Sequence, residues 1–281
     1  MNRATIAREI TASGIALHDG ASVTMTLSPA PPGAGVIFER GDVAAAVPAR
    51  WDLVGETRLG TVIGLDGASV GVVEHLMAAV AGAEIDDLFV RLDGPEPPIL
   101  DGDALSYLTL LQQAGRCEQA MPRRALKVLK DVTADDGKGR ATLRPAQTLS
   151  YHFEISFPSA AIGTQRFDFA FSRDGFAREI APARTFGFVQ ELDYLKSIDR
   201  GHGASLQNSL AIDGDHVLNR ELMRFPDEFV RHKILDAIGD MALAGAPLIG
   251  RFEGVRSGHG LNNALLKALF ADPANYVWVE P

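Results

Sequence analysis

One segment near the carboxyl end, residues 225–240 (FPDEFVRHKILDAIGD), places the strongest constraint on the fold. Pro226 suits the first turn of a helix, where its missing N–H costs nothing, and the two acidic residues after it complement the positive helix end. The apolar residues recur at roughly helical spacing and predict a face that packs into a core. His232, Asp236 and Asp240 are four residues apart, so a helix would place all three on one side.

The polar side of this helix admits two interpretations. A neutral imidazole above a carboxylate is half of a Zn²⁺ site, which needs one more protein ligand and a water. The alternative is a solvated face with a surface His–Asp contact. The segment by itself favours this second interpretation, because motif matches carry a real false-positive risk.

The composition bounds the class of protein. The chain has 281 residues, enough for two medium domains, and 46% hydrophobic with 22% charged residues is an ordinary globular balance. The formal net charge of -9 argues against a general nucleic-acid binder, although a local basic patch could still bind a phosphorylated ligand.

The sequence also predicts where the protein works. The first ten residues contain no apolar stretch typical of a secretory signal, and no apolar run approaches the length of a membrane span. Cys117 is the single cysteine, so an intrachain disulfide is impossible, which fits a reducing cytoplasm. We expect a cytoplasmic protein without an integral membrane segment, in which Cys117 is structural.

A second candidate for metal chemistry lies in residues 72–82 (VVEHLMAAVAG), which predict a core helix ended by Gly82. The adjacent Glu74 and His75 interrupt its apolar pattern, and polar groups in such a segment are costly unless satisfied. They are either a buried structural pair, or a metal ligand (His75) beside a general base (Glu74) that activates water.

Two further histidines lie in glycine-rich loops. His18 falls in a turn over residues 13–20, and His259 lies just before a last helix, from Leu261 to about Phe270. His18 is either a surface turn residue or a contact to the substrate or an oxyanion, and sequence spacing does not choose between these roles. His259 is either a loop histidine or an acid or cation that needs close approach to a ligand.

The order of elements predicts an α+β fold. Residues 61–65 and 68–70 read as a hairpin, residues 104–114 as a helix closed by Gly115, and residues 121–124 as a linker. On both sides of the linker the pattern runs strands, helix, strands, helix, which suggests a duplication. We expect domains over 1–121, with the Glu74/His75 helix, and 122–281, with the His232/Asp236 helix and the His259 loop.

Taken together, five segments resemble one enzyme family. They are residues 73–76 (VEHL), 95–102, 183–188 (ARTFGF), 229–240 and 257–263 (SGHGLNN). They occur in the order found in the UDP-3-O-acyl-N-acetylglucosamine deacetylases, which catalyse the committed step of lipid A synthesis in Gram-negative bacteria. The resemblance covers nearly the whole chain. It implies two similar α+β domains, each a sheet with two helices, packed helix to helix and carrying small inserts.

The resemblance also implies a ligand set and an acid–base pair. One catalytic Zn²⁺ would be held by His75, His232 and Asp236, with water as the fourth ligand, as an open hydrolytic site requires. Glu74 would be the general base. His259 would be the protonated group that stabilises the oxyanion and protonates the leaving amine.

Further residues match positions that assist the reaction in the family. Asp240 would orient His259 and favour its charged form, and Thr185 would help polarise the acetyl carbonyl. Lys233 and Phe186 would contact the substrate, and His18 would lie near the diphosphate. The expected partner is the acylated UDP-amino sugar, and family analogy predicts a monomer.

One region departs from the family pattern. Residues 198–209 correspond to a usually apolar loop beside the acyl chain, but here contain Asp199, Arg200 and His202. This difference concerns acyl-chain length and motivates one alternative, a related zinc amidohydrolase acting on another N-acylated sugar. A second alternative is a non-catalytic sugar-nucleotide or lipid-binding relative, which the intact set of metal-ligand and acid–base candidates speaks against.

Overall fold

The structure of the protein is a computed structural model, and it describes residues 1–280. The first half contains β1 (Asn2–Ile6), β2 (Ile10–Ile15), β3 (Ser22–Pro29), β4 (Val36–Arg40), β5 (Ala45–Pro48), a 3-10 turn (Trp51–Leu53), β6 (Val54–Glu56), β7 (Val62–Leu65), β8 (Ala68–Val70), α1 (Glu74–Gly82), β9 (Leu88–Leu92), α2 (Leu105–Ala114) and β10 (Arg116–Pro122).

The second half begins with β11 (Ala125–Val128), β12 (Val132–Asp135), β13 (Arg140–Arg144), β14 (Ser150–Ser156), β15 (Thr164–Ala170), α3 (Arg173–Gly175) with a π turn (Phe176–Ile180), β16 (Phe186–Phe188), a 3-10 turn (Val189–Glu191) and α4 (Leu192–Ser197). It continues with β17 (Leu210–Asp213), β18 (His216–Val217), a 3-10 turn (Arg220–Leu222), α5 (Glu228–Ala242), β19 (Leu248–Ile249), β20 (Arg251–Val255), α6 (His259–Ala271), a 3-10 turn (Pro273–Asn275) and β21 (Tyr276–Val279).

Two five-stranded sheets repeat the same topology. Their strand orders are β2-β3-β9-β4-β5 and β12-β13-β20-β14-β15. In each sheet the central pair, β4 with β9 or β14 with β20, is parallel, and the pairs around it are antiparallel. This element-by-element match confirms the duplication and the α+β class. We propose that the boundary between the two domains falls near residues 121 and 122.

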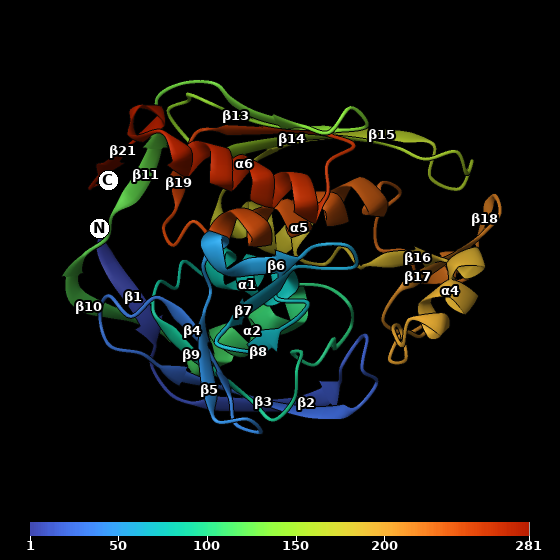
Figure 1. Cartoon of the computed structure of the whole chain (residues 1–281), viewed down its shortest axis with the longest axis horizontal. Helices are drawn as coiled ribbons and strands as arrows, with labels where there is room; N and C mark the ends of the chain where they lie inside the picture. Colours follow the sequence, from blue (N-terminus) through green and yellow to red (C-terminus); the bar gives the residue numbers. More distant parts are fainter. Residues whose placement is uncertain (281) are drawn as a thin grey trace.

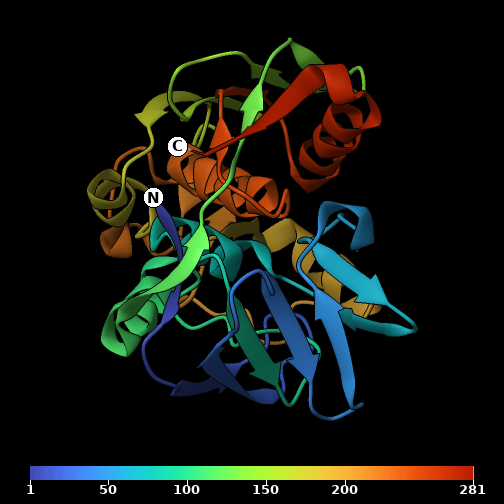
Figure 2. The same cartoon turned by 90° about the vertical axis from the view of Figure 1, so that its left-hand side faces the viewer.

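The two sheets enclose the helices. In Figure 1 the sheet of β13, β14 and β15 lies above α5 and α6, and the sheet of β2 and β3 lies below α1 and α2. Each domain has an insert at the corresponding point of its topology, β6–β8 before α1 and β16–β18 with α4 before α5. In Figure 2 the β6–β8 insert extends to one side of the helical layer. None of the helices in residues 1–280 is long and apolar enough to cross a membrane.

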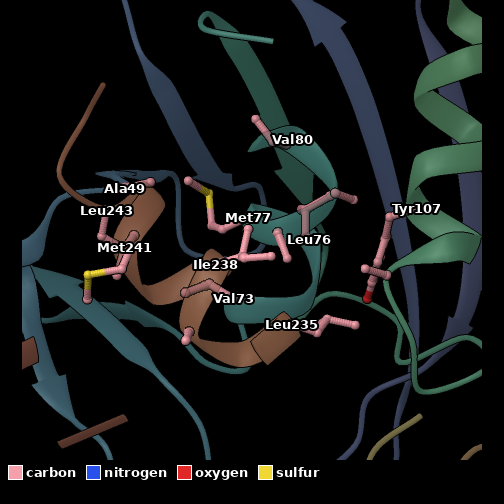
Figure 3. Packing of buried hydrophobic residues seen from close by; sticks show 14 of the residues in the cluster. Ala49, Val73, Leu76, Met77, Val80, Tyr107, Leu235, Ile238, Met241 and Leu243 are labelled. Atoms are coloured by element: carbon pink, nitrogen blue, oxygen red, sulfur yellow. The ribbon is translucent and has the colours of Figure 1, made fainter. Parts of the chain in front are cut away.

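The contact between α1 and α5 is the centre of the core. Leu76 and Met77 of α1 and Leu235 and Ile238 of α5 are buried, and their side chains lie around the place where the two helices meet (Figure 3). At Gly239 the backbones approach so closely that a Cβ atom would lie 1.9 Å from the carbonyl oxygen of Glu74. The two helices that carry the candidate site therefore touch backbone to backbone.

Two predicted helix ends differ from the structure in detail. α1 ends at Gly82, as predicted, but not through a left-handed glycine, because Ala83 stays helical and Glu84 takes the positive φ of 53°. Gly82 is instead required by packing, since a Cβ atom there would meet the Phe176 ring at 2.1 Å. His259 does not precede the last helix but is its first residue.

The strand boundaries also differ from those predicted. The alternating pattern of residues 3–10 predicts one strand, but the structure divides them between β1 and β2. Residues 125–132 also have the pattern of one strand and are divided between β11 and β12. The expected linker over 121–124 starts inside β10, where Asn2 pairs with Pro122. Pairing with a distant strand decided these boundaries, and local pattern does not report it.

Candidate metal centre and active site

Two buried helices bring the candidate residues together. Glu74 and His75 occupy the first turn of α1, while His232, Asp236 and Asp240 lie one turn apart along α5. All five residues are buried. The close contact of the helices at Gly239 therefore joins residues that are about 160 positions apart in the sequence.

His75, His232 and Asp236 form a cluster that could hold a metal ion. One ligand atom from each lies within 4.8 Å of the others. Asp236 Oδ1 is 3.6 Å from His75 Nε2 and 3.3 Å from His232 Nε2. The two imidazole rings stand nearly perpendicular, with an interplanar angle of 86° and centroids 4.9 Å apart. Three such ligands leave one position open in a tetrahedral zinc site, which is the arrangement of catalytic zinc.

Neighbouring groups orient these ligands. His232 Nδ1–H donates to the carbonyl oxygen of Ala183 over 3.1 Å, which leaves Nε2 facing the cluster. Lys233 Nζ donates to Asp236 Oδ2 over 2.6 Å, which leaves Oδ1 toward the histidines. Outer contacts of this kind commonly fix the tautomer and direction of metal ligands.

The Ala183 carbonyl is held in turn by a buried ion pair. Arg184 donates from its backbone N and from Nε to Glu228 Oε1, each over 3.0 Å, and both side chains are buried. Glu228 is the first residue of α5, so the segment that contacts His232 is tied to the helix that carries it.

The charge state of the cluster suits a cation. Burial lowers the pKa of His232 to about 3, so its ring is neutral, the form that binds metal. Burial opposes the charge of Asp236, yet the cationic groups around it, with the Lys233 ammonium nearest, hold its pKa well below the ordinary value. Asp236 Oδ1 is buried without a hydrogen-bond partner among residues 1–280, although buried oxygens are normally satisfied. The residues present therefore fit a divalent metal.

Glu74 has the environment of a general base. The backbone N–H of Thr61 donates to its Oε2 over 2.9 Å, so Oε1 is the oxygen that faces the site. Burial raises the pKa of Glu74, and the histidines beside it offset this only in part. A carboxylate with a raised pKa is a stronger base at neutral pH than an exposed one.

His259 lies on the other side of Glu74. Its Nε2 is 3.8 Å from Glu74 Oε1 and 4.0 Å from Asp236 Oδ2, while Nδ1–H donates to Asp240 Oδ2 over 2.9 Å. Burial would lower the pKa of the His259 ring, but the carboxylates of Asp240 and Glu74 outweigh it and raise the pKa to about 9. The ring is therefore protonated at neutral pH, as a general acid requires.

A cleft of about 460 Å³ opens onto these groups. Thr185, Phe186 and Lys233 line it together with Glu74, His75, His232, Asp236 and His259. Phe186 packs edge-on against Phe229, with centroids 5.0 Å apart. The structure thus brings all the predicted metal ligands, acid–base residues and two of the three predicted substrate contacts to one cleft, with Asp240 just behind His259.

Comparisons with known proteins agree with this geometry. Residues 3–271 match the family model of the UDP-3-O-acyl N-acetylglycosamine deacetylases. The chain belongs to this family.

Its relatives carry the name UDP-3-O-acyl-N-acetylglucosamine deacetylase. One, from Myxococcus xanthus (strain DK1622), is 46% identical over 277 residues, which cover 98% of this chain and 88% of that protein. Another, from Phenylobacterium zucineum (strain HLK1), is 47% identical over 265 residues, covering 93% and 90%. A third, from Aliarcobacter butzleri (strain RM4018), is 44% identical over 282 residues, covering 100% and 93%.

His18 is the one predicted substrate contact outside the cleft lining. Its ring Nε2 lies 3.1 Å from the carbonyl oxygen of Leu59, its Nδ1 is buried, and its backbone N–H donates to Glu96 over 2.8 Å. In this member of the deacetylase family, His18 contacts the loop that leads to Thr61.

Three functional candidates were missed from the sequence. Thr61 Oγ1 donates to Asp240 Oδ1 over 2.6 Å, Asn262 Nδ2 donates to Asp240 Oδ2 over 2.8 Å, and Ser257 Oγ donates to Asn262 over 2.7 Å. Asn262 lies within the family motif at 257–263, which was a usable signal. Thr61 sits in a strand-like stretch and has no comparable signal.

Proposed function

We propose that this chain hydrolyses the N-acetyl group of a UDP-3-O-acyl-N-acetylglucosamine, the committed step of lipid A biosynthesis. Water adds to the acetyl carbon, the C–N bond breaks, and acetate and the 2-amino sugar nucleotide leave. Membership of the deacetylase family supports this function. The observation that carries it is the buried His75–His232–Asp236 cluster with Glu74 and His259 beside it.

His75, His232 and Asp236 would hold one Zn²⁺. When bound, zinc supplies a Lewis acid for the acetyl carbonyl and makes a nearby water more acidic. The unsatisfied Asp236 Oδ1 and the neutral His232 ring support the assignment of these ligands.

Glu74 and His259 would divide the proton transfers. Glu74 Oε1 accepts a proton from the attacking water, and His259 Nε2 donates its proton to the amine nitrogen as the C–N bond breaks. The 3.8 Å between Glu74 Oε1 and His259 Nε2 lets both groups act on the same amide bond, one on the attacking water and the other on the amine nitrogen. Asp240 keeps His259 oriented and charged through Nδ1.

Thr185, Phe186 and Lys233 would bind the substrate. The Thr185 hydroxyl is suited to the developing oxyanion, together with the positive charge of His259. Phe186 offers an apolar ring near the sugar, and Lys233 a cation at the cleft. We assign His18 an indirect contribution near the diphosphate, through the Leu59 loop.

The polar loop at 198–209 favours an unusual acyl-chain preference. The backbone N–H of Gly203 donates to the carbonyl of Leu17 over 3.0 Å, and Leu17 lines the cleft. Within the loop His202 Nε2 lies 2.7 Å from Asp199 Oδ1. A polar wall at this position would shorten the apolar path available to an acyl chain, or would suit another N-acylated sugar. We further propose a monomer that works in the cytoplasm.

One coupled experiment tests the function. The protein is purified, zinc per chain is measured, and acetate release is assayed on UDP-3-O-acyl-N-acetylglucosamine with several acyl lengths. We expect one zinc per chain and release with at least one length, and loss of release in Glu74→Gln with zinc retained. Bound zinc without release at any length would move the substrate to another N-acylated sugar.

A further inference from the structure

Thr61 forms hydrogen bonds with Glu74, the proposed general base, and with Asp240, which orients the proposed general acid His259. Its backbone N–H donates to Glu74 Oε2 over 2.9 Å, and its Oγ1–H donates to Asp240 Oδ1 over 2.6 Å. Thr61 is buried, with 1% of its surface exposed. It belongs to the first domain and Asp240 to the second, so the side-chain bond crosses the domain interface.

The bond completes the hydrogen bonding of Asp240. His259 Nδ1 and Asn262 Nδ2 both donate to Oδ2, so Thr61 supplies the donor to Oδ1. With both oxygens held, the carboxylate plane has a fixed rotation, and Oδ2 points at His259. Without the hydroxyl of Thr61, Oδ1 would be a buried charged oxygen without a hydrogen-bond donor, which is energetically costly. The carboxylate would then rotate to reduce this cost.

The backbone bond has a matching effect on Glu74. Because Oε2 accepts from Thr61, Oε1 is left to face His259 Nε2 at 3.8 Å. The preceding Gly60 has a φ of 150°, and a Cβ atom there would lie 3.0 Å from Glu74 Oε1. The loop thus fits tightly over the carboxylate and leaves little freedom for the base.

The loop is anchored on both sides of Thr61. The Leu59 carbonyl contacts the His18 ring at 3.1 Å, and His18 is held by Glu96. The Thr61 carbonyl accepts the N–H of Val73, the residue before α1, over 3.3 Å. A rigid support of this kind is what a positioning residue needs.

We propose that Thr61 is a positioning residue that sets the relative placement of Glu74 and His259, the latter through Asp240. The inference rests on the proposed roles of Glu74, Asp240 and His259.

The test compares Thr61→Val, which keeps shape and the backbone N–H but loses the hydroxyl, with Thr61→Ser, which keeps the hydroxyl. Losing a hydrogen bond to a charged group predicts a fall in kcat of roughly ten- to a hundredfold for Thr61→Val. KM and zinc per chain should stay near those of the parent, and Thr61→Ser should recover most of kcat. Thr11→Val, which removes an exposed cross-strand bond to Thr26, is the matched control.

A double-mutant comparison separates positioning from a general structural role. Thr61→Val is combined with Asp240→Ala and, because that variant could fold poorly, also with His259→Ala. If Thr61 acts through these residues, adding Thr61→Val to either background should cost less than about twofold. The inference would be overturned by any of three results for Thr61→Val: an equal fall in kcat in all backgrounds, a loss of bound zinc, or a kcat like that of the parent. If Asp240→Ala and His259→Ala themselves keep full activity, the proposed acid–base roles fail instead.

Discussion

The closest approach in the core, at Gly239, makes a sharp test of how the site is assembled. In Gly239→Ala the added Cβ would lie 1.9 Å from Glu74 O, 2.7 Å from its carbonyl carbon and 2.9 Å from its Cα, whereas ordinary contacts begin near 3.4 Å. All three neighbours are backbone atoms, so no side chain can rotate away. The helices α1 and α5 must therefore separate or slide.

The expected cost has two parts. Overpacking of this severity destabilises by about 3 kcal/mol, which for a chain of this size lowers Tm by roughly 6–12 °C. Moving Glu74 by about 1 Å relative to Asp236 and His259 should lower kcat by about a hundredfold, because proton transfer and attack depend on that geometry.

The assay measures acetate release below the lowered Tm, together with thermal unfolding and zinc content. Gly55→Ala is the matched control, since a Cβ atom there meets nothing within 4 Å and its φ is not positive. Activity within twofold of the parent and an unchanged Tm in Gly239→Ala would show that the backbone contact does not set the site.

Four further outcomes follow from the charges and contacts of the site. The rate should form a bell in pH. It should fall above about pH 9, as His259 loses its proton, and fall in acid at a pH above the ordinary glutamate range, because the pKa of Glu74 is raised. A flat profile would contradict both roles. Asp240→Asn removes the carboxylate that raises the pKa of His259, so its alkaline limb should move to lower pH, and an unmoved limb would argue against the pairing. A chelator should abolish acetate release and added zinc should restore it, with unchanged activity in the zinc-free protein counting against the metal. Glu228→Gln leaves the buried Arg184 without its charged partner and should lower the free energy of unfolding by about 3 kcal/mol, measured by denaturant titration. A loss under about 1 kcal/mol would mean that the ion pair is not held as described.

The sequence alone determined which residues could share a helix face. The spacing of His232, Asp236 and Asp240 is a local property, and α5 places them as the helical period requires. The same holds for the Glu74–His75 pair at the start of α1 and for the strands–helix–strands–helix order in both halves. Together with the family motifs, these local patterns were enough to predict the α+β class and the candidate residues of the cleft.

Tertiary structure decided how those residues meet. Gly239 is an ordinary small residue in the sequence, yet its missing side chain permits the α1–α5 contact. Gly82 is the last residue of α1, as predicted, but the contact that requires a glycine there, with the Phe176 ring, lies 94 residues away in the sequence. Thr61 bonds Asp240 across 179 positions of the chain. Periodicity reports which way a side chain faces relative to its own backbone, whereas a hydrogen bond or a close contact between distant segments exists only once both domains have packed.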